Sequence, residues 1–179
     1  PRAPSRPATL GGRVTRKSDG KGIAGAIVSV AKTGRLGFFR DEPAPLVATT
    51  GADGAWTLGA VPPGRYGVTA TADGFLPGTD PDVAVAPGEQ RTDIALALAA
   101  GGTLVHGTVS DFGGGPIAGA MVSIAGTGAS GRSVAVTDKD GVYHVTLRAR
   151  GYVFRATHGD YVEKMRLVQG STTPLTVDL

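Results

Sequence analysis

IAGAIVSV, at residues 23–30, returns as IAGAMVSI at residues 117–124. The segments that follow match in the same order: TGADGAW at 50–56 corresponds to TDKDGVY at 137–143, and YGVTAT at 66–71 corresponds to YVFRAT at 152–157. Self-similarity at a fixed spacing indicates that one structural unit occurs repeatedly. The chain is therefore predicted to contain two copies of one domain.

The repeat divides the 179 residues into four parts. Residues 10–98 and 103–179 form the two copies, each of which is large enough for a modest hydrophobic core. Residues 99–102 form a short linker between them. Residues 1–9 are Pro-rich and lack apolar periodicity, which predicts an extended linker that follows an upstream part of a longer protein.

Two-residue alternation of apolar side chains predicts β-strands in both copies. Examples are residues 27–30, 56–58, 66–71 and 94–98, and their boundaries carry turn-forming pairs such as Asp53-Gly54 and Asp140-Gly141. Glycine and proline interrupt every window long enough for an amphipathic helix. We therefore expect an all-β chain of two tandem antiparallel β-sandwiches, each with approximately seven strands.

Composition excludes several classes of function. The chain contains no cysteine, so disulfides and thiol catalysis are excluded. Its net charge of +3 is spread over both copies without a dense basic face, which argues against nucleic-acid binding. No segment approaches the roughly 20 apolar residues that span a bilayer, so direct membrane insertion is not expected.

These motifs together resemble the carboxypeptidase regulatory-like domain. The resemblance rests on the early strand, the Gly-Ile-Ala-Gly-Ala segment at 22–26, the Thr-x-x-Asp-Gly-x-Trp hairpin at 50–56 and Pro-Pro-Gly-Arg-Tyr at 62–66. It implies a transthyretin-like or Ig-like sandwich, related to the Cna-B-type modules of surface proteins, in two tandem copies. The second copy departs from the pattern at 148–152, where Arg-Ala-Arg-Gly-Tyr replaces the proline-containing hairpin.

The family is named after peptidases, but no catalytic motif is found. His106, His144 and His158 lie on separate predicted strands without metal-ligand spacing, although His144 and His158 are expected to be able to approach each other across a sheet. The serines lack a nucleophile-elbow motif. We therefore expect no enzymatic activity, no metal and no cofactor.

An insertion in the first copy gives the best candidate for a binding site. Residues 35–45 have no counterpart in the shorter second-copy loop, and such loops commonly carry binding residues. The predicted binding residues are Phe38, Phe39, Arg35 and Arg40. The alternative is that one phenylalanine closes the open end of the first sandwich. A secondary basic cluster is predicted at Arg148, Arg150 and Arg155.

The aromatic residues Trp56, Tyr66, Tyr143 and Tyr152 occupy matching places in the two copies, so we expect them in the cores rather than on a sugar-binding surface.

The predicted function is a non-catalytic spacer or protein-docking module within a larger surface or periplasmic protein. The expected partner is another protein or a neighbouring domain of the parent chain. The alternatives are a glycan-binding module and, more distantly, an accessory domain of a peptidase. Extracytoplasmic location follows from the family resemblance.

Overall fold

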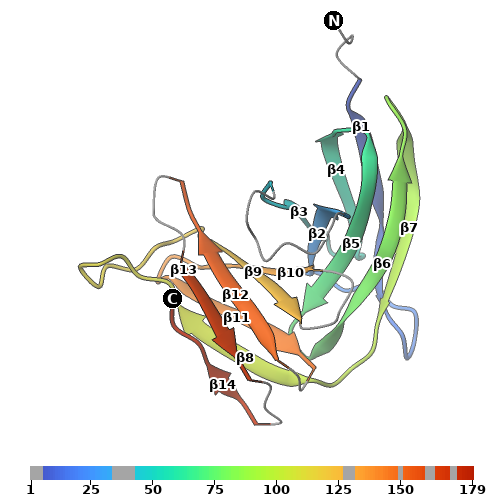
Figure 1. Ribbon diagram of the computed structural model, residues 1–179. Helices are drawn as coiled ribbons and strands as arrows, with labels where there is room; N and C mark the ends of the chain where they lie inside the picture. Colours follow the sequence, from blue (N-terminus) through green and yellow to red (C-terminus); the bar gives the residue numbers. More distant parts are fainter. Residues whose placement is uncertain (1–5, 34–42, 127–131, 149–150, 160–163, 170–172) are drawn as a thin grey trace, which may run out of the picture.

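The computed structural model describes residues 6–33, 43–126, 132–148, 151–159, 164–169 and 173–179. These residues form fourteen β-strands and no helix, arranged as two β-sandwiches that follow one another along the chain (Figure 1). Each sandwich consists of one three-stranded and one four-stranded sheet. The predicted all-β fold is therefore confirmed, with seven strands in each copy.

In the first copy, β1 lies at the centre of the three-stranded sheet, which has the order β4-β1-β7. The facing sheet has the order β3-β2-β5-β6. The strands are β1 (Ala8–Arg16), β2 (Ile27–Lys32), β3 (Leu46–Thr49), β4 (Ala55–Val61), β5 (Gly64–Ala72), β6 (Phe75–Val85) and β7 (Gln90–Leu98).

The second copy repeats this topology. Its three-stranded sheet has the order β11-β8-β14 and its four-stranded sheet the order β10-β9-β12-β13. The strands are β8 (Thr103–Thr108), β9 (Met121–Gly126), β10 (Arg132–Val136), β11 (Val142–Leu147), β12 (Tyr152–Thr157), β13 (Lys164–Val168) and β14 (Leu175–Thr176).

Each copy contains one parallel strand pair in an otherwise antiparallel arrangement. The last strand of each copy, β7 or β14, runs parallel to the first strand, β1 or β8. Apolar alternation indicates which face of a strand is buried but not its direction. The expected antiparallel pairing holds for the other described strand pairs, and the terminal strand of each copy is the exception.

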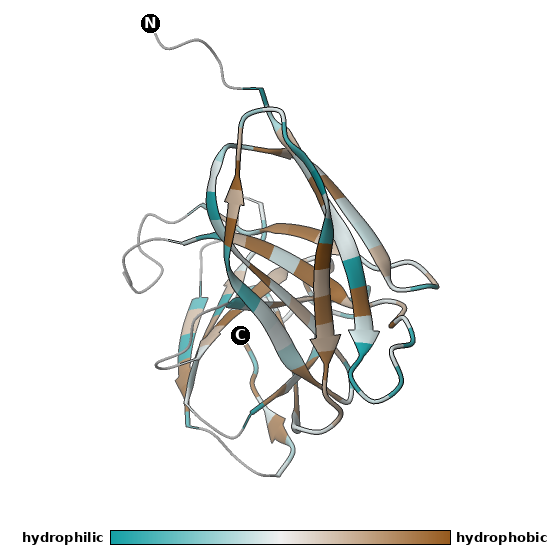
Figure 2. Ribbon diagram, turned by 90° about the vertical axis from the view of Figure 1, so that its right-hand side faces the viewer, coloured by the Kyte–Doolittle hydropathy of each residue, from teal (hydrophilic) through white to brown (hydrophobic). Residues whose placement is uncertain are grey.

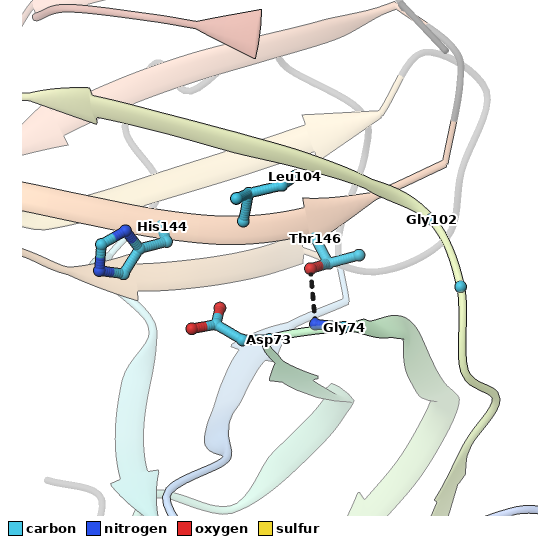
Figure 3. A pocket seen from close by; sticks show the side chains of 7 residues that line it. Asp73, Gly74, Gly102, Leu104, His144 and Thr146 are labelled. Carbon is cyan, nitrogen blue, oxygen red and sulfur yellow. Dashed lines mark hydrogen bonds between the residues drawn. The ribbon is translucent and has the colours of Figure 1, made fainter. Parts of the chain in front are cut away.

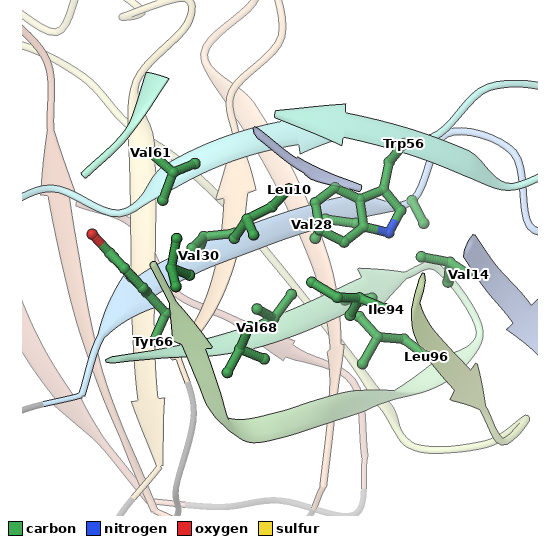
Figure 4. Packing of buried hydrophobic residues seen from close by; sticks show 14 of the residues in the cluster. Leu10, Val14, Val28, Val30, Trp56, Val61, Tyr66, Val68, Ile94 and Leu96 are labelled. Atoms are coloured by element: carbon green, nitrogen blue, oxygen red, sulfur yellow. The ribbon is translucent and has the colours of Figure 1, made fainter. Parts of the chain in front are cut away.

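The cores lie between the two sheets of each sandwich. Figure 2 shows apolar and polar residues alternating along several strands, as expected when one face of a sheet is buried. Figure 4 shows Trp56 and Tyr66 among the aliphatic side chains of the first core, and both are buried, as are Tyr143 and Tyr152 in the second. The predicted core positions of these four aromatic residues are confirmed.

A threonine after the third strand of each copy fixes the IAGA segment that precedes the second strand. The Thr50 hydroxyl donates to the Ile23 carbonyl at 2.6 Å and accepts from the Ala26 N–H at 2.8 Å. Thr137 makes the same two bonds in the second copy, at 2.7 and 2.8 Å. Buried backbone groups need such partners, so the repeated threonine holds each IAGA segment against its neighbouring strand.

Candidate functional site

The two copies meet where the edge strand β10 of the second copy lies against β2 and β5 of the first. The Ser29 hydroxyl donates to the Arg132 carbonyl at 2.7 Å, and the Thr71 hydroxyl donates to the Val134 carbonyl at 3.1 Å. Because β10 ends its sheet, β9 is its only neighbouring strand among the described residues. The hydroxyl groups of the first copy thus supply hydrogen-bond donors to carbonyls on a sheet edge.

Burial confirms that this contact, which we call the seam, is closed to water. Thr69 and Thr71 alternate along β5 with the core residues Val68 and Ala70, so they belong to the outer face of their sheet. Outer-face residues are usually hydrated, yet Thr69 and Thr71 are only 2% and 5% exposed. Val134 of β10 is 1% exposed although it is not part of the second core. The second copy therefore covers part of the outer surface of the first.

The linker between the copies is held at both ends. Leu76 N–H donates to the Ala99 carbonyl at 2.8 Å, and Gly101 N–H donates to the Gly74 carbonyl at 3.0 Å. Gly74 N–H in turn donates to the hydroxyl of Thr146 of the second copy at 3.0 Å (Figure 3). The β5–β6 turn is thus bonded both to the linker and to β11.

Two hollows of about 360 and 490 Å³ lie beside the seam. Asp73 from the first copy and His144 from the second line both of them, and Figure 3 shows both side chains at the smaller hollow. Neither side chain makes a hydrogen bond or ion pair with another described residue. The larger hollow is also lined by apolar side chains, including those of Ile27, Phe75 and Val136. Volumes of this size are typical of small-molecule sites.

No hydroxyl nucleophile is left unengaged among the described residues that line these hollows. The hydroxyls that line them, from Thr71 and Thr146, are engaged in the seam bonds described above. No group of three metal-binding side chains occurs in the described part of the chain. The carboxylate of Asp73 and the imidazole of His144 remain, together with the guanidinium of Arg16 in the larger hollow, and these groups can bind a polar ligand but form no catalytic constellation by themselves.

Two ionisable groups near His144 are fixed in their ordinary charge states. Backbone N–H groups of Val142 and Asp140 bond to the Asp138 carboxylate and lower its pKa. Burial raises the pKa of Tyr143, whose hydroxyl donates to the Val177 carbonyl at 2.6 Å. Asp138 is therefore ionised and Tyr143 protonated at neutral pH, and neither is suited to proton transfer there.

The prediction that His144 and His158 can approach each other across one sheet is wrong. His144 lies on β11 of the three-stranded sheet, whereas His158 follows β12 of the four-stranded sheet. The residue opposite His144 is His106 on β8. The His106 ring nitrogen Nε2 is 3.2 Å from the Thr176 hydroxyl. Sequence spacing did not reveal the pairing because β8 and β11 are brought together only by the sandwich topology.

The predicted binding residues Phe38, Phe39, Arg35 and Arg40 lie outside the described residues, and so does Arg150. The other members of the predicted basic cluster lie on different sheets. Arg148 follows β11 and its N–H donates to the Tyr152 hydroxyl at 3.1 Å, whereas Arg155 belongs to β12. Both sets remain predictions.

The sequence pattern did not identify Ser29, Thr69 and Thr71 as contact residues, although it predicted the strands on which they lie. A usable signal was present, because small hydroxyl side chains at neighbouring outward positions differ from the charged residues of a solvated face. The carbonyls that they contact carry no side-chain signature at all.

Exposed aromatic residues do not form a platform in the described part of the chain. Phe112 is fully exposed at the tip of the β8–β9 connection, but the other described aromatic side chains are buried or half-buried. Sugar-binding surfaces usually present aromatic faces. The described residues therefore offer no feature that favours glycan binding. No helix long and apolar enough to cross a bilayer occurs among them either.

Two segments of the chain, residues 9–99 and 104–179, match the model of the carboxypeptidase regulatory-like domain. No match was found among curated proteins.

Solved structures with similar folds have low sequence identity. The Bacillus anthracis TIE protein is 16% identical with a TM-score of 0.40, over 97% of this chain and 33% of that one. A streptococcal ancillary pilin is 13% identical with a TM-score of 0.40, over 96% of this chain and 61% of that one. A putative carbohydrate-binding protein from Pseudomonas aeruginosa is 14% identical with a TM-score of 0.40, over 52% of this chain and 90% of that one. The chain thus spans a third and about three fifths of the first two proteins.

Proposed function

Because this chain belongs to the carboxypeptidase regulatory-like domain family, with two copies of the domain in tandem, we propose that it is a non-catalytic structural module. It acts as a spacer or protein-docking unit within a larger surface or periplasmic protein. The observation that carries this proposal is the seam, where Ser29 and Thr71 bond to backbone carbonyls of β10.

The seam supports a rigid unit rather than two independently moving domains. Tandem domains move relative to each other by default unless their interface is substantial. Here, opening the seam removes the partners of two edge-strand carbonyls and hydrates Thr69, Thr71 and Val134, which are buried in the closed form. Each such hydrogen bond contributes about 0.5–1.5 kcal/mol net relative to the opened form, in which water takes the place of the partner. A rigid connection transmits a fixed distance and orientation between the ends of the module, which is what a spacer needs.

The side-chain chemistry supports a non-catalytic role. The two hollows beside the seam are lined by an aspartate and a histidine, with Arg16 in the larger hollow. The hydroxyl groups of Thr71 and Thr146, which also line them, are engaged in structural hydrogen bonds. Acyl transfer needs a nucleophile with an adjacent base. Function is therefore assigned to the surfaces and geometry of the module, and extracytoplasmic placement is part of the same proposal.

Distance measurements between spin labels test the rigid arrangement. Since the chain lacks cysteine, Thr57→Cys on β4 and Lys139→Cys in the β10–β11 turn introduce two unique labelling sites, both on exposed residues. We expect one narrow distance distribution. As a control, a flexible insertion between Ala100 and Gly101 should leave the distribution narrow if the seam maintains the arrangement.

A broad or multimodal distribution for the doubly labelled protein itself would contradict the proposal. The labelled protein, with and without the linker insertion, must have the thermal stability of the unlabelled protein. Partial unfolding would also broaden the distance distribution.

A further inference from the structure

The second copy presents an unpaired strand edge at β13. This strand is the last in the order β10-β9-β12-β13, and no described strand pairs with its outer side. Its register on β12 places Met165 opposite Arg155 and Leu167 opposite Val153. An exposed edge carries backbone N–H and C=O groups that can pair with an incoming strand.

The side chains of β13 alternate between apolar and basic. Met165 and Leu167 are 52% and 67% exposed, and both belong to the outer face of the sheet. Lys164 and Arg166 occupy the intervening positions and are also exposed. Large apolar residues that are exposed together commonly mark an interaction surface.

The corresponding edge strand of the first copy is protected in a way that β13 is not. Strand β6 contains Pro77 and Pro81, and proline has no N–H for pairing with a further strand. Asp82 of β6 bonds to the Arg65 side chain at 2.7 Å, and the beginning of β6 bonds to the linker through Leu76. Strand β13 contains no proline.

The charges of β13 select the type of strand that can be added. Lys164 makes no ion pair with a described residue. Arg166 donates to the backbone carbonyl of Asp178 at 3.1 Å. The Asp178 carboxylate accepts hydrogen bonds from Thr108, and these bonds together with the nearby charge of Arg166 lower its pKa. Basic residues on an edge oppose pairing with apolar or basic strands. Acidic residues opposite them convert this opposition into attraction.

We propose that β13 is a docking edge for an extended segment of a partner protein, with acidic residues at alternate positions and apolar residues between them. The segment adds as a fifth strand beyond β13. Its acidic side chains face Lys164 and Arg166, and its apolar side chains extend the Met165 and Leu167 surface. This mode of recognition combines backbone hydrogen bonds with side-chain selection. The inference rests on the docking part of the proposed function and names the surface and the partner chemistry.

A synthetic peptide tests the proposal directly. The probe is an acetylated and amidated peptide of three Glu-Val repeats, titrated against the whole chain while backbone amide NMR signals are followed. We expect the largest shifts at residues 164–168 and slower amide exchange there. A matched Lys-Val peptide should bind at least about tenfold more weakly, because it places like charges opposite each other.

Three variants assign the contact. Lys164→Glu should weaken binding of the Glu-Val peptide several-fold and strengthen binding of the Lys-Val peptide. Leu167→Ser should weaken binding of both peptides. Lys21→Glu makes the same charge change at an exposed position of the first copy and should leave both affinities unchanged. Thermal unfolding identifies any variant that fails to fold.

Methylated peptides distinguish strand addition from side-chain attraction. In an added strand, alternate N–H groups face the edge and the others face outward. We therefore compare two methylated peptides, one N-methylated at the glutamates and one at the valines. Binding should be lost for one of these peptides and kept for the other. Equal binding by both methylated forms, equal binding of the two charge types, or shifts centred away from β13 would each overturn the proposal. Failure here leaves the spin-label distances unaffected, so docking and spacing are tested separately.

Discussion

Ser29 and Ser123 occupy equivalent positions in the two copies, yet only one of them contributes to the seam. Both are buried and lie on the second strand of their copies. The Ser29 hydroxyl donates to the Arg132 carbonyl, whereas the Ser123 hydroxyl makes no hydrogen bond with another described residue, although its backbone pairs with β10 and β12. The same residue at the same point of the fold therefore acquires a different role from what packs over it. The two copies therefore share the residues that form each sandwich, but they do not share the contacts made by the outer faces of their sheets.

The largest expected difference concerns glycines that touch the terminal strands. A Cβ atom at Gly12 would lie 1.8 Å from the Ile94 carbonyl oxygen, and one at Gly107 would lie 1.9 Å from the Val177 oxygen. Strand β7 is held to β1 by seven register pairs. Strand β14 is held to β8 by two pairs, and the residues after it add two backbone bonds, from Val177 N–H to the His106 carbonyl and from Leu179 N–H to the Thr108 carbonyl. We expect Gly12→Ala to reduce the free energy of unfolding by about 3 kcal/mol or more, and Gly107→Ala to reduce it less because β14 can shift more easily.

Urea denaturation measures this comparison. Gly59→Ala is the matched control, since an added Cβ atom there meets nothing within 4 Å. Equal losses for the two crowded glycines would show that the length of the terminal strand does not control how easily it moves.

A smaller effect is expected at the seam. The double change Ser29→Ala with Thr71→Val removes both hydroxyl donors to β10 and should lower the free energy of unfolding by about 2 kcal/mol, with about 1 kcal/mol for each hydrogen bond. The equivalent change in the second copy, Ser123→Ala with Thr157→Val, removes only a 3.4 Å bond from Thr157 to Met121 and should cost less.

Chemical denaturation and spin-label distances, measured for both double variants, sharpen the comparison. We expect only the Ser29 and Thr71 variant to broaden the distance between the copies. If the two double variants lose similar amounts of stability and the distances between the copies do not change, the seam does not explain the difference between Ser29 and Ser123.

The smallest effect concerns acid stability at the last strand of each copy. Asp178 has its pKa lowered mainly by the backbone N–H of Thr108, and the corresponding position in the first copy is Ala97. A lowered folded-state pKa contributes stability above the unfolded value of about 4, and that stability is lost as pH falls through the folded pKa. We expect Asp178→Asn to flatten the loss of stability on acidification.

Thermal midpoints measured from neutral pH downwards check this expectation. Ala97→Ser introduces a polar residue that does not titrate at the corresponding site and should leave the acid response unchanged. If Asp178→Asn loses as much stability on acidification as the parent protein, the carboxylate of Asp178 does not contribute to it.

Several features of the fold were predictable because they depend on neighbouring residues. The pair Asp53-Gly54 forms a turn because Gly54 adopts a φ of 83°, which glycine accommodates readily. Trp56 and Tyr143 are buried because they lie on inward positions of alternating strands. Local conformation and side-chain periodicity thus indicated strands, turns and core without knowledge of which strands pair.

The candidate site was less predictable because its contacts cross the repeat boundary. His106 and His144 are far apart in sequence but lie opposite each other in β8 and β11. Asp73 and His144 come from different copies and line the same hollows. The insertion containing Phe38 and Phe39 lies outside the described residues, so its binding role remains a prediction. The residues next to a side chain in sequence do not predict which residues of another strand the topology places beside it.

The sequence alone determined two tandem sandwiches, their turns and the faces of their strands, because apolar alternation and positive-φ glycines act over a few residues. Only the tertiary structure decided the parallel terminal strands, the hydroxyl-to-carbonyl seam and the contrast between β6 and β13. These features depend on backbone groups and packing partners that lie far apart along the chain. A carbonyl of β10 has the same chemistry in every strand, and its position beside Ser29 or Thr71 gives it a specific role.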